Sequence, residues 1–197
     1  MGSIIANMFL TLDGVYQGPG GREEDPSDGF EFGGWQAPVS DEEGGADIGA
    51  QIERIDALLL GRKTYDIFAA YWPQQSGPIA DVLNRVPKFV VSSTLTEANW
   101  EGTTVLRDAE AAGRLRNEYD EVHLFGSGVL IRSLLAARLL DRLHAYLYPV
   151  VLGQGKRLFG DGVIPTTFRL AQPARTFPRG AVSLVYEVAG EVELRDM

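Results

Sequence analysis

Short runs of apolar and β-branched residues recur along the chain, and turn-forming residues mark most of the gaps between them. Runs of this kind are typical of strands, and those that are apolar at every position are typical of a buried sheet. They predict strands at residues 3–12, 57–61, 88–91, 103–106, 121–125, 142–152 and 182–188. The last of these alternates apolar and polar residues, as one arm of an antiparallel hairpin would.

Between most of these runs, apolar residues return at helical spacing. Ile48, Ile52 and Ile55 are three or four positions apart, which predicts a helix at residues 47–56. Further helices are predicted at residues 66–71, 79–83 and 109–119, and a longer apolar helix after the glycine turn at 126–128. Because strands and helices alternate through the middle of the chain and strands end it, we expect an α/β domain with a mainly parallel central sheet and an antiparallel C-terminal edge.

A stretch rich in glycine, proline and acidic residues, at residues 18–45, separates the first predicted strand from the first predicted helix. Loops of this length are usually either functional or disordered. Phe30, Phe32 and Trp35 lie within it, and three large apolar rings favour a segment that packs against the domain. We therefore expect an inserted loop that closes over a ligand as a lid, with Trp35 at the pocket.

Length and composition bound the class of protein. A chain of 197 residues with 45% hydrophobic content is long enough for one domain, residues 1–197, that buries about 70% of its extended-chain surface. It has no apolar run of about 18 residues and no secretory signal at its N-terminus, so we expect a cytoplasmic protein without a membrane partner. Zero cysteines and only two histidines argue against a metal site.

The net charge of −9 comes from one segment. Residues 22–56 hold 11 acids and 2 bases, whereas the remainder holds 16 of each. A run of charge usually forms a solvated face, and an acidic chain repels a polyphosphate backbone, so we expect no nucleic-acid partner. A small anion could still bind at a local pocket lined by basic side chains or backbone amides.

Three polar segments directly follow predicted strands. They are Gly61, Arg62, Lys63 and Thr64; Ser92, Ser93 and Thr94; and Gly126, Ser127, Gly128, Val129 and Leu130. Ligands of parallel sheets bind at the carboxyl ends of the strands, so we expect these segments to meet in one site. The third segment places a glycine turn at a helix start, where backbone N–H groups and the helix dipole favour an anion. The dipole is worth only about 0.3–1 kcal/mol, so the turn alone leaves open a phosphate site or a tight turn before a packed helix.

The order and placement of these segments resemble the dihydrofolate reductase fold, in which Gly-Arg-x-Thr, Ser-Ser and a glycine-rich turn follow strands and hold NADPH. A Rossmann unit is a poorer match, because its glycine motif follows the first strand and Ile131 stands where its third glycine would be. The chain is more closely similar to the family that shares its fold with the reductase domain of the bifunctional riboflavin-biosynthesis deaminase-reductase. The matching stretches are LDG at 12–14, Trp35, GRKTYD at 61–66, VSSTL at 91–95, GSGVLIRSLL at 126–135, DRL at 141–143 and PVVLGQG at 149–155.

The resemblance implies a three-layer dihydrofolate reductase-like fold, with helices on both faces of the sheet. It also implies NADPH as cofactor and hydride transfer to a small heterocyclic substrate, pterin-like or pyrimidine-like, similar to 5-amino-6-(5-phosphoribosylamino)uracil reductase. In that setting Arg62 and Lys63 would neutralise a phosphate and favour NADP, and the hydroxyls of Thr64 and residues 92–94 would donate hydrogen bonds. Residues 126–131 would bind the pyrophosphate through backbone amides.

The family resemblance also bears on assembly, since its members pair as dimers. The C-terminal residues 182–194 could supply or support such an interface, because the edge of a strand needs covering. We therefore expect a homodimer.

Asp13, Trp35 and Phe125 are the remaining candidates at the site. Asp13 is the only carboxylate of the first strand and its turn, so it could contact a substrate amine or assist protonation, although Asp-Gly after a strand commonly just makes the turn. Trp35 could stack on a flat ring. Phe125 stands just before the glycine turn, where the riboflavin-pathway reductase has an acidic residue that contacts substrate. This difference leaves the substrate open.

A second difference concerns the first helix, in which dihydrofolate reductases carry one acid that contacts the pterin. The corresponding region here holds Glu42, Glu43, Asp47 and Glu53, and position singles out none of them. Two alternatives therefore stay open beside a riboflavin-type reductase: a dihydrofolate reductase proper and a non-catalytic NADP(H)-binding protein. The two histidines, His123 and His144, lie within apolar strand patterns, which is typical of core residues.

Overall fold

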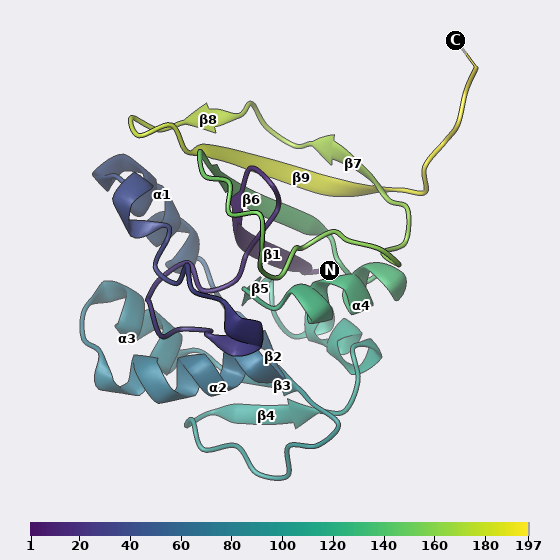
Figure 1. The fold of residues 1–197 in the computed structure, drawn as a ribbon. Helices are drawn as coiled ribbons and strands as arrows, with labels where there is room; N and C mark the ends of the chain where they lie inside the picture. The colour runs from purple at the N-terminus through teal and green to yellow at the C-terminus, as the bar shows by residue number, and fades with distance from the viewer. Residues whose placement is uncertain (197) are drawn as a thin grey trace.

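The structure, a computed structural model, describes residues 1–196, and within these residues nine strands form one sheet (Figure 1). The strands lie in the order β4-β3-β2-β5-β1-β6-β9-β7, and β8 pairs with β9. Their bounds are β1 Ser3–Thr11, β2 Ala57–Gly61, β3 Lys88–Val91, β4 Thr103–Leu106, β5 Glu121–Phe125, β6 Arg142–Tyr148, β7 Thr167–Leu170, β8 Arg175–Thr176 and β9 Val182–Gly190.

The sheet is parallel in its centre and antiparallel at one edge. β1 pairs in parallel with β5 and β6, β2 with β3 and β5, and β3 with β4. β9 runs antiparallel to β6, β7 and β8. Parallel neighbours need crossover connections. Helices provide most of them, whereas residues 92–102 connect β3 to β4 without a helix. The predicted α/β class, with a mainly parallel centre and an antiparallel C-terminal edge, is confirmed.

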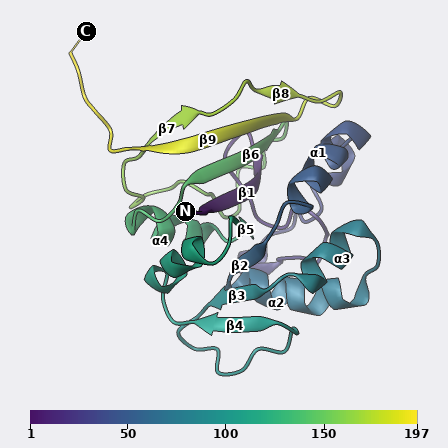
Figure 2. The same ribbon diagram turned by 180° about the vertical axis from the view of Figure 1, so that it is seen from behind.

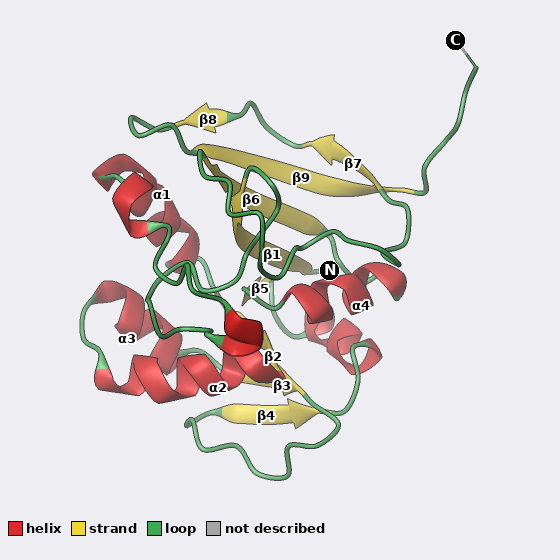
Figure 3. Cartoon of the chain, viewed as in Figure 1, coloured by secondary structure: helices red, strands yellow, loops and turns green. Residues whose placement is uncertain are grey.

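Helices cover both faces of this sheet (Figures 2 and 3). The helices are α1 Glu42–Ile52, α2 Arg62–Tyr71, α3 Pro78–Arg85 and α4 Gly128–Ala136, with short 3-10 helices η1 Ser27–Gly29, η2 Ala37–Val39, η3 Trp72–Gln74 and η4 Glu110–Asn117. Leu58 and Leu60 of β2 join a core with α1, α2 and α3, whereas Leu59 joins a core with α4 and η4. Side chains alternate between the two faces of a strand, so this fully apolar strand is buried on both. The expected three-layer arrangement is thus confirmed.

α1 begins and ends earlier than the helix predicted at residues 47–56. The Asp41 carboxylate caps it by accepting a hydrogen bond from the Gly44 amide at 2.9 Å. Gly45 and Gly49 also lie inside the helix. Packing of the apolar face outweighs the weak helix propensity of these glycines, which had favoured a loop.

Other elements also differ from the prediction, and α2 begins four residues earlier than expected, at Arg62. The helix predicted at 109–119 is the 3-10 helix η4, and the strand predicted at 142–152 stops before Pro149. β7 and β8 were not predicted, because each is short and mostly exposed. Both pair with β9, so β9 is an internal strand and the edge of the sheet lies at β7 and β8. None of the helices within residues 1–196 is long and apolar enough to span a membrane.

The long loop at residues 18–45 packs on the domain, as its aromatic rings predict. Phe30 and Trp35 are only 5% and 7% exposed and share a core with Tyr146 and Tyr148 of β6. The Trp35 ring stands edge-on to Tyr148, with centroids 5.7 Å apart. Its indole N–H also donates a hydrogen bond to the Gln17 carbonyl at 2.8 Å. The loop is therefore held to the antiparallel side of the sheet by a buried aromatic cluster.

Candidate active site

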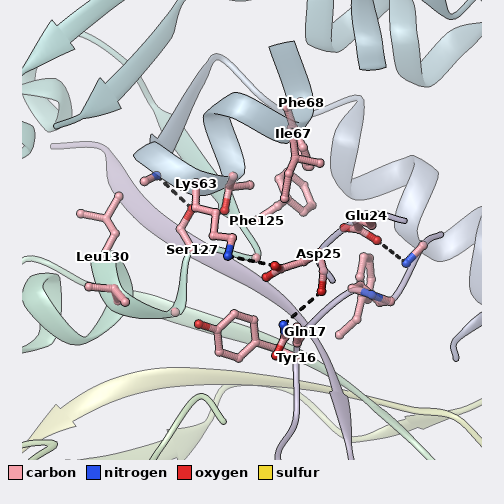
Figure 4. Close-up of a pocket in the computed structure, with 18 of the residues that line it drawn as sticks. Tyr16, Gln17, Glu24, Asp25, Lys63, Ile67, Phe68, Phe125, Ser127 and Leu130 are labelled. Atoms are coloured by element: carbon pink, nitrogen blue, oxygen red, sulfur yellow. Dashed lines mark hydrogen bonds and ion pairs between the residues drawn. The ribbon is translucent and has the colours of Figure 1, made fainter. Parts of the chain in front are cut away.

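One large cleft, of about 1410 Å³, crosses the carboxyl ends of β2, β3 and β5 (Figure 4). All three predicted polar segments line it, at residues 61–64, 92–94 and 126–130, and so does Phe125. They meet because β2 lies between β3 and β5 in a parallel arrangement, so their ends share one edge of the sheet. The cleft then continues to an aromatic end beside β6 and α1.

Ser127 ties the glycine turn to the start of α2. Its hydroxyl accepts a hydrogen bond from the Gly61 amide at 2.9 Å and donates one to the Thr64 hydroxyl at 3.0 Å. A Cβ at Gly61 would lie 3.4 Å from the Ser127 side chain, in van der Waals contact. Gly126 has a φ of +56°, a left-handed conformation that favours glycine. Two of the predicted segments therefore form one hydrogen-bonded unit.

The start of α4 presents backbone amides to the cleft. The Ile131 amide donates the first helical hydrogen bond, to the Ser127 carbonyl at 2.9 Å, so the amides of Val129 and Leu130 precede it. Both residues line the cleft. Amides before the first helical bond, together with the helix dipole, favour an anionic group such as pyrophosphate.

The ring of Tyr16 packs against Gly128. A Cβ at Gly128 would lie 2.5 Å from this ring, so any larger residue would require the ring to move. Tyr16 itself lines the cleft (Figure 4), and burial raises the pKa of its phenol, which keeps the hydroxyl able to donate a hydrogen bond. The sequence pattern placed Gly128 in the glycine turn but did not indicate Tyr16, because the two residues are far apart in the chain.

Two arginines line the polar half of the cleft. Arg62 pairs with Asp66 at 2.9 Å on an exposed part of α2. Arg107 was missed by the sequence analysis, and its guanidinium donates a hydrogen bond to the Leu95 carbonyl at 2.8 Å. Arg107 follows β4 directly. The rule that selected the other segments, polar residues just after a strand, would have selected it too.

Two lysines pair with the same carboxylate of the long loop, that of Asp25. Lys63 was predicted as a site residue, whereas Lys156 was not. Asp25 lies 2.9 Å from Lys63 Nζ (Figure 4) and 2.7 Å from Lys156 Nζ. Both ammonium groups also contact the Ser27 hydroxyl. Burial raises the pKa of Asp25, but hydrogen bonds from the two ammonium groups and Ser27 outweigh it and lower the pKa to about 2. The loop is therefore tethered to the first turn of α2 by an ion pair that persists at neutral pH.

Glu24, next to this cluster, is held by backbone amides alone. Its Oε2 accepts hydrogen bonds from the amides of Gly20 at 2.6 Å and Gly21 at 3.2 Å, and the residue lines the cleft. Burial raises the pKa of the Glu24 carboxyl despite these hydrogen bonds. Such a carboxyl keeps its proton to a higher pH than an exposed one, as a general acid requires.

Asp13, the expected proton donor, is not among the described residues that line the cleft. Its carboxylate accepts hydrogen bonds from the Thr11 hydroxyl at 2.6 Å and the Gly153 amide at 2.9 Å, and it pairs with Arg157 at 3.1 Å. The Thr11 hydrogen bond, opposed by burial and helped by backbone amides, lowers the pKa of Asp13 to about 2. A carboxylate with this pKa is a poor proton donor. The geometry therefore gives Asp13 a structural role, joining the turn after β1 to the segment after β6.

Trp35 supports the cleft from behind, and its neighbour Gln36 is the residue that lines it. The Gln36 amide donates a hydrogen bond to the Tyr148 hydroxyl at 2.6 Å. The expected position of Trp35 at the pocket is thus off by one residue. The sequence predicts that aromatic rings of this loop are buried. Only the folded structure shows that the Trp35 ring packs into the core and does not line the cleft.

The aromatic end of the cleft contains no free carboxylate from the middle of α1 in the part of the chain that is described. Its main apolar lining residues are Phe9, Ile48, Tyr146, Tyr148 and Phe177. Asp47 of α1 accepts a hydrogen bond from the Tyr146 hydroxyl at 2.8 Å and pairs with Arg175 at 2.6 Å. The Asp47 carboxylate is therefore already paired with Tyr146 and Arg175 and is not among the residues that line the cleft.

Both histidines lie in the core, as predicted. His123 Nδ1 lies 3.0 Å from Asn7 Nδ2, and His144 Nε2 lies 2.7 Å from Ser183 Oγ. Burial lowers the pKa of both imidazoles, that of His144 to about 4. Both are therefore neutral at neutral pH.

Comparison with known proteins agrees with this geometry. The chain matches the family model of the RibD C-terminal domain over residues 2–182. It is 28% identical over 198 residues to the uncharacterized protein YyaP of Bacillus subtilis (strain 168), covering 95% of both chains.

Solved structures share the fold. A putative riboflavin biosynthesis protein from Shewanella sp. PV-4 superposes with a TM-score of 0.71 at 21% identity, covering 94% of this chain and 98% of that one. Dihydrofolate reductase from Enterococcus faecalis, solved with NADP(H), superposes with a TM-score of 0.59 at 16% identity, covering 95% and 96%. The family model spans most of the chain, so this protein belongs to the RibD C-terminal domain family.

Proposed function

We propose that this protein is an NADPH-dependent reductase that transfers a hydride to a small heterocyclic substrate, similar to the riboflavin-pathway reductase. Its family and its fold support reductase chemistry of the pyrimidine or pterin type. The observation that carries the proposal is a single cleft in which three polar strand-end segments adjoin an aromatic end. Its volume of about 1410 Å³ exceeds the roughly 300–1,000 Å³ of an ordinary small-molecule pocket, so a dinucleotide and a second flat ligand both have room.

The polar half of the cleft fits NADPH. The amides of Val129 and Leu130 would bind the pyrophosphate, and the hydroxyls at residues 92–94 would bind phosphate or ribose oxygens. Arg62 and Arg107 supply the positive charge that a 2′-phosphate needs. The hydride is supplied by bound NADPH, and the protein's part is to hold the two rings together and exclude water.

Hydride transfer to a heterocycle also needs a proton at the neighbouring heteroatom. We assign this role to Glu24, which lines the cleft and whose pKa is raised by burial. Asp25 cannot fill it, because its pKa is about 2 and two lysines hold its carboxylate ionised. Asp13, which was expected to donate the proton, is also excluded by its pKa of about 2. We therefore assign proton donation to Glu24 in place of Asp13.

A dihydrofolate reductase proper is the weaker alternative. Dihydrofolate reductases use the same cofactor, NADPH, as the proposed reaction. They also use an acid of the first helix to contact the pterin. Here Asp47 is engaged by Tyr146 and Arg175, and Asp41 is engaged as the helix cap. The cleft therefore lacks a free α1 carboxylate among the described residues.

Two measurements test the proposal. Calorimetric titration should show tighter binding of NADPH than of NADH. Oxidation of NADPH should then be followed with dihydrofolate and with the deaminated pyrimidine intermediate of riboflavin biosynthesis, and the pyrimidine should be the better substrate. Tight NADPH binding without turnover of either class would identify a non-catalytic NADP(H)-binding protein, and no NADPH binding would overturn both interpretations.

We also propose a homodimer, with the interface at the β7 and β8 edge of the sheet. β9, which we expected to contribute an edge, is covered by those two strands, whereas Leu170 of β7 is 43% exposed. An uncovered strand edge favours pairing with another chain. Light scattering at micromolar concentration tests this, and a mass near the 21.5 kDa of one chain would contradict it.

A further inference from the structure

The long loop is joined to α2 through a single side chain of that helix, Lys63. Its ammonium group contacts the Asp25 carboxylate at 2.9 Å and the Ser27 hydroxyl. Within residues 1–196, no other hydrogen bond or ion pair connects residues 18–45 to α2. Figure 4 shows the Asp25–Lys63 pair reaching from the loop to the helix, and both residues line the cleft. The pair therefore bridges two walls of the cleft.

Asp25 is also held from a second part of the chain. Lys156, in the segment after β6, lies 2.7 Å from Oδ2 of Asp25, whereas Lys63 contacts Oδ1. The backbone carbonyl of Asp25 accepts a hydrogen bond from the side-chain amide of Gln17 at 3.0 Å, and Gln17 is buried. Because each carboxylate oxygen has its own cation and the carbonyl has a buried donor, Asp25 is fixed relative to both α2 and the segment after β6.

Glu24, the residue before Asp25, belongs to a turn that closes on itself. Its carboxylate accepts hydrogen bonds from the amides of Gly20 and Gly21, and its own amide donates one to the Gly21 carbonyl at 3.2 Å. These contacts all lie inside the loop. The position of the turn in the cleft therefore depends on the residues that join the loop to the domain, and Asp25 is adjacent to it in the chain.

The charge of Asp25 acts on the Glu24 carboxyl as well. Burial raises the pKa of Glu24, hydrogen bonds from the two glycine amides lower it, and the negative charge of Asp25 raises it further. The charged groups that face Asp25 from the surrounding elements are Lys63 of α2, Lys156 after β6 and, through Lys156, Asp28 of the loop at 3.9 Å. Asp25 thus influences both where the Glu24 carboxyl lies and how firmly it keeps its proton.

We infer that Asp25 is a positioning residue for proton transfer, which holds the loop through Lys63 and Lys156 so that the Glu24 carboxyl faces the cleft. This inference rests on the proposed function, because Glu24 is the proton donor assigned there. Asp25 does not donate the proton. It fixes the turn that carries Glu24 and supplies a negative charge beside it.

The test compares Asp25→Asn with Asp28→Asn in the full chain. Both variants remove one negative charge of the loop near Lys156, but the Asp28 side chain is 82% exposed. Its φ of +60° is a left-handed conformation that asparagine tolerates. NMR titration of the side-chain carboxyl carbons measures the pKa of Glu24 without any substrate. Asp25→Asn should lower this pKa by about half a pH unit or more, because a neighbouring charge and burial are both lost, and Asp28→Asn should leave it nearly unchanged.

Limited digestion with trypsin measures how firmly the loop is held. Arg22 is exposed and lies in the turn that carries Glu24. Cleavage after Arg22 should be faster in Asp25→Asn than in the wild type by about fivefold or more, because the loop opens more often. Lys63→Met removes one partner of Asp25 at a side chain that is 53% exposed, and it should accelerate cleavage to a smaller extent. This second variant decides the question if a melting curve shows that Asp25→Asn does not fold.

Turnover separates positioning from a general loss of structure. With NADPH and the deaminated pyrimidine intermediate, kcat of Asp25→Asn should fall by about tenfold. NADPH affinity should not fall, because the substitution removes a negative charge from the cleft. An equal loss of kcat and NADPH affinity would overturn the inference, and so would an unchanged Glu24 pKa together with unchanged cleavage. A lowered Glu24 pKa and faster cleavage without turnover would support the positioning of Glu24 and overturn the proposed reductase.

Discussion

The polar and aromatic ends of the cleft are built in different ways. The polar end consists of three short segments, each directly after a strand, and one hydroxyl, that of Ser127, joins two of them. The aromatic end gathers single residues from β1, β6, α1 and the segment before β9. A site made of contiguous segments leaves a pattern in the chain, whereas a site made of scattered residues does not. Variants at each end and between them test whether the two ends are as separate as this comparison implies.

The largest effect should come from the support behind the aromatic end. Trp35→Ala removes a buried ring that packs against Tyr148, so we expect a loss of about 3–5 kcal/mol in the free energy of unfolding. Denaturant unfolding measures this. Phe32→Ala is the matched control, because Phe32 is a ring of the same loop that is 43% exposed, and it should cost well under 1 kcal/mol. Equal losses in the two variants would show that the loop is not anchored by its buried ring.

The next effect concerns the polar end. In Gly128→Val the new side chain would meet the Tyr16 ring, and overpacking of this kind costs about 1–3 kcal/mol. We expect NADPH affinity to fall by about a hundredfold or more while the fold persists. Calorimetry and a melting curve on the same sample measure both. If the double variant Gly128→Val, Tyr16→Ala recovers NADPH affinity, the Tyr16 ring causes the crowding. If Gly128→Val binds NADPH normally, the glycine turn has no role in binding the cofactor.

Glu24 lines the cleft and is the proposed proton donor, so its variant should affect turnover more than binding. Removing a general acid commonly costs a factor of about 10²–10⁴, and we expect Glu24→Gln to lower kcat by about a hundredfold. The acid must be protonated, and burial raises its pKa, so kcat of the wild type should fall as pH rises through a pKa above the ordinary glutamate value. That limb of the pH profile should vanish in Glu24→Gln.

The exposed neighbour Glu23 provides the control for this experiment. Glu23→Gln should retain both kcat and the pH profile. A Glu24→Gln enzyme with an unchanged profile would remove Glu24 from proton transfer.

The smallest effect should be confined to cofactor choice. A charge-assisted arginine contact is worth roughly 1.5–3 kcal/mol, so Arg62→Ala should lower NADPH affinity by about one to two decades and NADH affinity much less. Arg85→Ala, at the exposed end of α3, should change neither. Equal losses for the two cofactors in Arg62→Ala would remove Arg62 from the 2′-phosphate site.

Much of the sheet could be predicted from local pattern. β2, β3, β4 and β5 have the predicted bounds, because each is a short apolar run that ends at a polar or turn-forming residue. The same pattern located the three polar segments, since a residue that follows a parallel strand must lie at the ligand-binding edge of the sheet. β7 and β8 escaped prediction because they are short, exposed and stabilised only by pairing with β9.

The direction of individual side chains was decided by the tertiary structure. Asp13 and Glu24 are both acids near turns in the sequence, yet the first is bound by Arg157 and the Gly153 amide and the second lines the cleft. Tyr16 on Gly128 is a contact between residues more than a hundred positions apart. By itself the sequence determined the central strands and the three segments of the polar end, because backbone conformation and burial follow from neighbouring residues. The aromatic end required the folded chain, since its chemistry depends on which distant side chains are brought together and which of them are already paired.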